Sequence, residues 1–238
     1  MSEPKYKRVL VKLSGEALRG QQKDGIFDFS MLDRIAASIK SCVDMGAEVA
    51  LLVGAGNIWR GAKGVGMNRS CADSMGMLAT MINTLALKDA LTRAGVDAVA
   101  TSSSEMGEYA ELYRRDLAVE HLSHGQVVIL GGGLGNPYFT TDSAAVLRAL
   151  ELDVDAAILA KNIDGVYDSD PRKNPDAVKL ERVSYSYIID NRLGVIDLTA
   201  AELARESGLK ILLCALEDPE NIIRAVAGEK IGTIASDE

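Results

Sequence analysis

The α/β character of this chain is plainest in residues 127–150, VVILGGGLGNPYFTTDSAAVLRAL. The apolar run 127–130 predicts a buried strand, and the run 143–150 predicts a helix. A glycine-rich loop, 131–142, joins the two. Glycines let the backbone approach a ligand closely, and the N-terminus of a helix adds positive potential. The loop therefore favours a phosphate-binding site.

A plain connection between strand and helix is the alternative interpretation of this loop. In that case Thr140, Thr141 or Asp142 only caps the helix. The loop by itself leaves both interpretations open.

Short apolar runs rich in β-branched residues occur along the rest of the chain. They predict buried strands at residues 9–11, 49–53, 96–100, 127–130, 156–160 and 211–213. Strands that alternate with helices predict an α/β fold, a three-layer αβα sandwich around a mostly parallel, twisted sheet. We expect residues 1–238 to form one domain.

Helical segments are expected between these strands. The first has apolar residues at helix spacing, namely Leu32, Ile35, Ile39 and Val43. We expect it to begin at Ser30, with Asp33 three residues on, and to end at Gly46. A second helix is marked by Leu78, Ile82 and Leu85.

Four glycine-containing or polar loops follow predicted strands. They are Lys12–Glu16, Gly54–Asn57, Gly131–Asp142 and Lys161–Val166. In open parallel sheets, ligands bind beyond the carboxyl ends of the strands. The grouping therefore favours one long phosphate-bearing ligand or two ligands at this edge.

The composition limits the partners and the compartment. A formal net charge of -8 argues against a nucleic-acid surface, which needs basic residues. Three widely spaced cysteines predict neither a disulfide framework nor a zinc site, and they fit a reducing cytoplasm. The longest apolar run, 211–216, is far shorter than the roughly 20 residues of a membrane span. We expect a cytoplasmic protein without nucleic-acid or membrane partners.

Several common catalytic motifs do not occur. The sequence has no G-x-x-x-x-G-K-[ST] and no G-x-S-x-G, and loop 131–136 lacks the third glycine of G-x-G-x-x-G. The two histidines, His121 and His124, lie at an expected helix end before Gly125, where a charge near the helix C-terminus explains them. We assign them no catalytic role.

Five charged residues remain as candidates. Lys12 is a phosphate ligand or a lysine at a strand end, and Arg60 is a phosphate ligand or a surface charge. Asp73 is explained by a helix N-cap, and Asp170 by turn chemistry. Asp142 is a cap, or it orients a lysine or shares a metal. Cations and glycine loops without a basic histidine indicate phosphoryl transfer, which depends on positioning and charge stabilisation.

Several motifs resemble a known family. Lys12 with Ser14 and Gly15, the loop at Gly54, and residues 164–167 (DGVY) are of a kind shared by many amino acid kinases. More specific are GMNR at 66–69, DSMGMLAT at 73–80 and GNPYFTTD at 135–142. Over nearly its whole length the chain resembles the bacterial uridylate kinases of the amino acid kinase family.

The resemblance implies transfer of the γ-phosphoryl group of ATP to UMP, giving UDP and ADP in pyrimidine supply. Mg²⁺ is carried on the nucleotide, and no protein ligand of the metal is assigned. The implied catalytic residues are Lys12, Arg60 and Asp142, with Asp142 orienting Lys12. The implied ATP-binding residues are Lys12, Leu13, Ser14, Gly15, Gly56 and Arg60, with Lys161, Asn162, Tyr167 and Asp170 around the base and ribose. The implied UMP-binding residues are Gly54, Ala55, Asp73, Leu134, Gly135, Asn136, Pro137, Tyr138, Phe139, Thr140 and Thr141.

The resemblance also implies a homohexamer that UTP inhibits and GTP activates. The implied GTP-responsive segment comprises Gln21, Gln22, Lys23, Asp24, Gly25 and Ile26. Ala55 replaces a glycine usual in the family, and Leu134 stands where threonine is common. Both departures bear on the contacts to UMP.

Two other functions remain open at this point. One is a kinase of the same fold that phosphorylates a carboxylate or carbamate, and the other is a non-catalytic protein that senses nucleotides or stores oxyanions. Motifs 73–80 and 135–142 favour a nucleotide acceptor over the first. The presence of Lys12, Arg60 and Asp142 favours turnover over the second.

Overall fold

The computed structural model describes residues 3–20, 25–60, 66–169, 171 and 174–237. The strands are β1 (Arg8–Leu13), β2 (Glu48–Val53), β3 (Ala98–Ser102), β4 (Glu111–Leu112), β5 (Val127–Gly131), β6 (Ala156–Lys161), β7 (Val166–Tyr167), β8 (Lys179–Leu180), β9 (Arg182–Val183), β10 (Ile211–Ala215) and β11 (Thr233–Ala235). The helices are α1 (Gly15–Leu18), α2 (Phe29–Asp44), α3 (Arg69–Arg93), α4 (Arg115–Ser123), α5 (Thr141–Glu151), α6 (Tyr185–Asp190), α7 (Leu198–Ser207) and α8 (Glu220–Val226).

Within the described residues, one sheet has nine strands in the order β4-β3-β5-β2-β1-β6-β10-β11-β9. Its neighbouring strands are parallel except for β10 and β11. All six predicted strands form, although the one expected at 96–100 begins two residues later, at Ala98. The prediction of a mostly parallel α/β sheet is confirmed.

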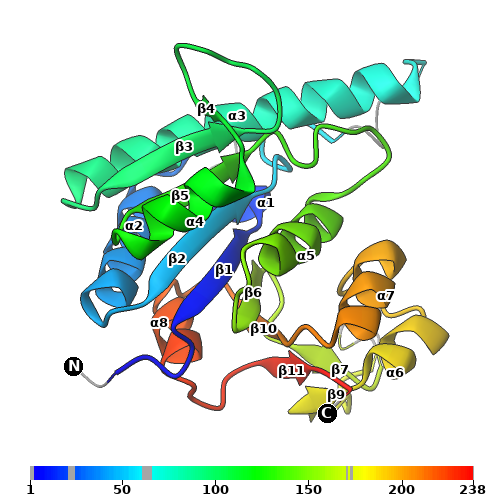
Figure 1. The fold of residues 1–238 in the computed structure, drawn as a ribbon. Coiled ribbons are helices and arrows are strands. Elements are labelled where there is room, and N and C mark those ends of the chain that lie inside the picture. The colour runs from blue at the N-terminus through cyan, green and yellow to red at the C-terminus, as the bar shows by residue number, and fades with distance from the viewer. Residues whose placement is uncertain (1–2, 21–24, 61–65, 170, 172–173, 238) are drawn as a thin grey trace.

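Helices cover both faces of the sheet (Figure 1). Val9, Val11 and Leu13 of β1 belong to the core shared with α2, α3 and α8. Leu10 belongs to the core on the other face, where α4, α5, α6 and α7 pack. Because central strands are buried on both faces, they are apolar at nearly every position.

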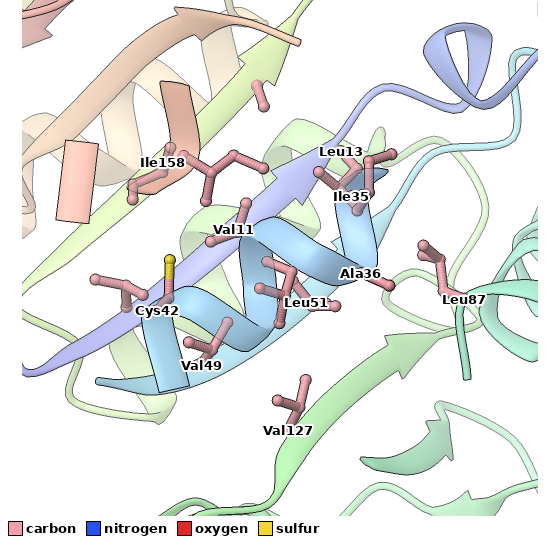
Figure 2. Packing of buried hydrophobic residues seen from close by; sticks show 14 of the residues in the cluster. Val11, Leu13, Ile35, Ala36, Cys42, Val49, Leu51, Leu87, Val127 and Ile158 are labelled. Carbon is pink, nitrogen blue, oxygen red and sulfur yellow. The ribbon is translucent and has the colours of Figure 1, made fainter. Parts of the chain in front are cut away.

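In the first of these cores, side chains of α2 pack against side chains of β1 and β2. Figure 2 shows Ile35, Ala36 and Cys42 of α2 over Val11 and Leu51 of the sheet. Burial raises the pKa of the Cys42 thiol to about 12, so the thiol behaves as an apolar core group. This packing fixes β1 and β2, whose carboxyl ends carry two of the glycine loops.

Helix α2 begins earlier than its sequence predicts. Its N-cap is Asp28, whose carboxylate accepts hydrogen bonds from the backbone N–H groups of Ser30 and Met31. The expectation that Ser30 opens the helix is therefore wrong. A carboxylate that accepts two N–H groups satisfies two of the free donors at the helix start. Gly46, with a positive φ, follows the C-cap as expected.

Helix α3 contains the three apolar residues that predicted it, but they face away from the sheet. The exposed fractions of Leu78, Ile82 and Leu85 are 56%, 47% and 37%. Small and polar residues such as Thr80 and Asn83 are buried instead. Apolar spacing predicts a helix, but it does not say which side of that helix meets the core.

Candidate active site

A cavity of about 390 Å³ lies beyond the carboxyl ends of β1, β2 and β5. It brings together most of the residues implied for catalysis and substrate binding, namely Lys12, Ser14, Gly15, Gly54, Ala55, Gly56, Arg60, Asp73, Leu134, Asn136, Phe139, Thr140 and Thr141. Among the described residues, those expected in the site that do not line this cavity are Leu13, Gly135, Pro137, Tyr138, Asp142, Lys161, Asn162 and Tyr167. Three loops that are distant in sequence thus meet at one edge of the sheet.

Lys12 lines one end of this cavity, and its ammonium group shares a carboxylate with a second ammonium group. Oδ1 of Asp142 is 3.0 Å from Nζ of Lys12, and its Oδ2 is 2.6 Å from Nζ of Lys161. The neighbouring strands β1 and β6 bring the lysines together, and the first turn of α5 supplies the aspartate. Burial raises the pKa of Asp142, but the two ammonium groups outweigh burial and hold its pKa below the usual range.

The two lysines of this cluster have different surroundings. Burial lowers the pKa of Lys161, which also donates a hydrogen bond to the carbonyl of Val195 and lies near Asp197. Lys12 lines the cavity and Lys161 does not. The Lys12 ammonium group is therefore the one that can meet an anion in the cavity.

The helix-cap interpretation of Asp142 is wrong, because Thr140 is the N-cap of α5. Its Oγ1 accepts hydrogen bonds from the N–H groups of Asp142 and Ser143. Asp197, the N-cap of α7, in turn accepts hydrogen bonds from the hydroxyl groups of Thr140 and Ser143. The carboxylate of Asp142 is left free for the lysines.

Asp73 lines the other end of the cavity. Asn68 caps α3, so the prediction of Asp73 as an N-cap is wrong. The Asp73 carboxylate accepts hydrogen bonds from Nε of Arg69, over 2.7 Å, and from the backbone N–H of Tyr138, over 2.9 Å. Tyr138 has a φ of 73°, unusual for a residue with a side chain, and its ring lies under the Arg69 guanidinium. Asp73 thus ties α3 to loop 134–141.

A fourth ion pair, between Arg60 and Glu16, also lines the cavity. Nη2 of Arg60 is 2.5 Å from Oε1 of Glu16, and both side chains are exposed. Asn162 donates a hydrogen bond to the other carboxylate oxygen of Glu16 over 3.3 Å. Sequence reasoning missed Glu16 as a site residue, although its place in the first turn of α1, beside Gly15, was a usable signal.

Thr80 and Arg69 were also missed as site residues, although both lie in the motifs that suggested the family. The Oγ1 of Thr80 accepts a hydrogen bond from the N–H of Gly132, over 2.9 Å. The carbonyl of Met77 accepts one from the same hydroxyl group. Thr80 and Arg69 both line the cavity, and Thr80 fixes the backbone of the glycine loop.

A second cavity, of about 700 Å³, lies beyond β6 and β10. Asn162 and Tyr167 line it, and the Tyr167 hydroxyl group donates a hydrogen bond to Asp164. Lys161, expected around the base and ribose with these residues, is held at Asp142 instead. Asp170 lies outside the described residues. The Asn162–Glu16 hydrogen bond joins the edges of the two cavities.

The segment expected to respond to GTP is described only in part. Gln21, Gln22, Lys23 and Asp24 lie outside the described residues, whereas Gly25 and Ile26 lie within them. The carbonyl of Ile26 accepts a hydrogen bond from Nδ2 of Asn57.

Two searches of the described residues were negative. They contain no group of three or more His, Cys, Asp or Glu side chains that could hold a metal ion. No helix in the same part of the chain is long and apolar enough to cross a membrane.

Comparison with known proteins agrees with this geometry. A UMP kinase from Bacillus anthracis is 40% identical, the match covers 98% of this chain and 97% of that one, and the TM-score is 0.93. A UMP kinase from Ureaplasma parvum is 34% identical over the full length of both chains, with a TM-score of 0.91. A uridylate kinase from Archaeoglobus fulgidus is 30% identical over 96% of this chain and 99% of its own, with a TM-score of 0.74. The model of the amino acid kinase family matches residues 7–215, and the chain belongs to that family.

Proposed function

We propose that the protein transfers the γ-phosphoryl group of ATP to UMP, giving UDP and ADP. The observation that carries the proposal is the cavity in which Lys12 and the two glycine loops face Asp73 and loop 134–141. The structures named above as UMP or uridylate kinases support it over nearly the full length of the chain.

This chemistry needs no general base. A phosphate monoester has a second pKa near ~6, so the UMP phosphate is already largely ionised at neutral pH. Asp142 is also a poor base, because its two lysine partners hold its pKa low. The protein instead stabilises the developing charge with the Lys12 ammonium group, and Asp142 fixes that group in place.

The two substrates occupy adjacent cavities in this proposal. Asn162 and Tyr167 contact the ATP base and ribose in the larger cavity, and the phosphates extend past Glu16 towards Lys12. Asp73 contacts the UMP sugar, and loop 134–141 surrounds the nucleotide. Arg60 moves from Glu16 to a phosphate oxygen when the phosphates enter.

Mg²⁺ fits this site as a companion of the nucleotide phosphates. Both carboxylate oxygens of Asp142 are next to ammonium groups, and the described residues offer no cluster of acidic ligands. When bound with the nucleotide, the ion would supply positive charge that neutralises the phosphates.

Assembly and regulation complete the proposal. The exposed apolar side chains Met75, Leu78, Ile82 and Leu85 of α3 support association with a second copy, within a homohexamer. We also propose activation by GTP through the segment that ends at Ile26, inhibition by UTP, and action as one domain in the cytoplasm.

The test is ADP release from Mg-ATP by the purified protein. UMP, CMP, dUMP, glutamate, acetylglutamate, aspartate and carbamate are supplied as separate acceptors. We expect turnover with UMP. Turnover with a carboxylate or carbamate alone would replace the proposal with the acid-kinase alternative, and nucleotide binding without turnover on any acceptor would favour a sensing or storage protein.

A further inference from the structure

Two buried asparagines, Asn57 and Asn83, do not line the smaller cavity, but Asn83 bonds to Gly54, which does. Asn57 is the last residue of the glycine loop after β2, and Asn83 belongs to the buried side of α3. Nδ2 of Asn57 donates to Oδ1 of Asn83 over 3.0 Å, and Nδ2 of Asn83 donates to Oδ1 of Asn57 over 2.8 Å. The two amides therefore bond to each other in both directions.

Each amide also bonds to one backbone carbonyl. Nδ2 of Asn57 donates to the carbonyl of Ile26 over 2.8 Å, and Nδ2 of Asn83 donates to the carbonyl of Gly54 over 2.7 Å. Both nitrogens thus use both of their protons, as buried amides require. The pair links α3, the loop after β2 and the chain segment before α2.

The bond to Gly54 fixes the start of a cavity-lining loop. The N–H of Gly54 donates to the carbonyl of Leu13 over 3.0 Å, so both backbone polar groups of Gly54 have partners. Ala55 and Gly56 come next and line the cavity, and within the described residues their N–H groups have no backbone acceptor. Free N–H groups of such a loop can bind phosphate oxygens.

The other glycine loop packs against the same groups. A Cβ added to Gly15 would lie 2.3 Å from the carbonyl oxygen of Gly54 and 2.8 Å from Oδ1 of Asn57. The distance between the two loops is therefore set by the carbonyl that Asn83 holds.

We propose that Asn83 is a positioning residue for phosphoryl transfer, holding the N–H groups of Ala55 and Gly56 in place through the Gly54 carbonyl. The proposal rests on the kinase function proposed above. Asn57 orients the Asn83 amide, but among the described residues no hydrogen bond joins the Asn57 side chain to Gly54. The two members of the pair therefore have separable effects.

The test compares Asn83→Asp with Asn57→Asp. Each replaces one buried amide of the same pair by a carboxylate, and each keeps one hydrogen bond between the two side chains. Only Asn83→Asp removes the donor to Gly54, whereas Asn57→Asp removes the donor to Ile26. Thr84→Val is the matched control, because Thr84 is buried on the same helix and its hydroxyl group has no hydrogen-bond partner among the described residues.

We expect similar losses of thermal stability in the two aspartate variants, but a kcat at least tenfold lower for Asn83→Asp than for Asn57→Asp. The KM values for UMP should stay within about threefold of each other, and Thr84→Val should behave as the wild type. Equal kcat values in the two folded variants would overturn the proposal. If a carboxylate prevents folding, Asn83→Ala and Asn57→Ala provide the same comparison.

Hydrogen–deuterium exchange of the backbone at 54–57 provides a readout that does not depend on the reaction. We expect faster exchange in Asn83→Asp than in Asn57→Asp. Equal exchange would overturn the positioning role even if the wild type phosphorylates UMP. A wild type inactive towards UMP would instead overturn the proposed function, and the exchange comparison would still decide the role of Asn83.

Discussion

The two ends of the smaller cavity hold their charges in different ways. At the Lys12 end, a buried aspartate is shared by two lysines on adjacent strands of the sheet. At the Asp73 end, the carboxylate is shared by an exposed arginine of the same helix and by a loop N–H group. The first end is fixed by core packing, whereas the second can exchange partners when a ligand arrives.

We therefore expect the two ends of the cavity to have different roles in stability, turnover and substrate binding. A buried ion cluster loses much stability when one partner is removed, because the remaining charges stay desolvated. At the Asp73 end only the arginine is exposed, and an ion pair with one exposed partner contributes less and can be replaced by contacts to a ligand. Substitutions at the Lys12 end should therefore affect stability and turnover, and those at the Asp73 end should affect substrate binding.

The largest effect is expected for Asp142→Asn, which leaves two buried ammonium groups facing each other. We expect a loss of about 3 kcal/mol in the free energy of unfolding, measured by urea denaturation. Asp116→Asn, on the exposed surface of α4, is the control and should cause no measurable loss. An Asp142→Asn protein as stable as the wild type would remove the contrast between the two ends.

Lys12→Ala should lower kcat by at least about a hundredfold, which corresponds to roughly 2.7 kcal/mol of transition-state stabilisation. Steady-state kinetics with Mg-ATP and UMP measures it. Lys40→Ala, which removes an exposed lysine of α2, should leave kcat unchanged. A near-normal rate for Lys12→Ala would exclude this ammonium group from the reaction.

Asp73→Asn should raise the KM for UMP about tenfold, roughly 1.4 kcal/mol, and leave the KM for ATP nearly unchanged. The reason is that Asp73 lies at the end of the cavity assigned to the acceptor. The two KM values, determined in one kinetic series, serve as each other's control. Equal increases in both would mean that Asp73 only supports the fold.

The smallest effect is expected from acid. The pKa of Asp142 is lower in the folded state than its ordinary value of 3.8, so its stabilisation is fully present above that value and is lost as the pH falls through the folded pKa. The stability difference between wild type and Asp142→Asn should therefore stay constant from pH 7 to about pH 5 and shrink only below about pH 4. Denaturation curves at several pH values measure this, and a difference that shrinks near pH 6 would contradict it.

The sheet could be predicted from sequence because buried parallel strands are apolar at nearly every position. The cavity could be located for a related reason, since loops that follow parallel strands meet at one edge. Residues such as Lys12, Gly54 and Thr140 therefore came together as expected.

The partners of charged residues could not be predicted in the same way. Lys161 contacts Asp142 because β6 lies next to β1 in the sheet. The local sequence of a strand does not reveal which strands lie beside it. Asp73 was assigned to a cap because α3 was expected to start near it. Asn68, five residues earlier, is the N-cap instead, and Asp73 pairs with Arg69 in the first turns of the helix. The outward direction of Leu78 depends on what packs against α3, which a repeat of apolar residues does not specify.

Gly15 shows how a distant part of the chain can restrict which amino acids a position accepts. Its φ is not in the left-handed region, so its own backbone would accept other amino acids. The requirement comes from the Gly54 carbonyl, which occupies the space that any side chain would need. Random mutagenesis should therefore recover replacements of Gly15 only together with second changes in loop 54–57, and two stretches of sequence that look like independent motifs should evolve as one.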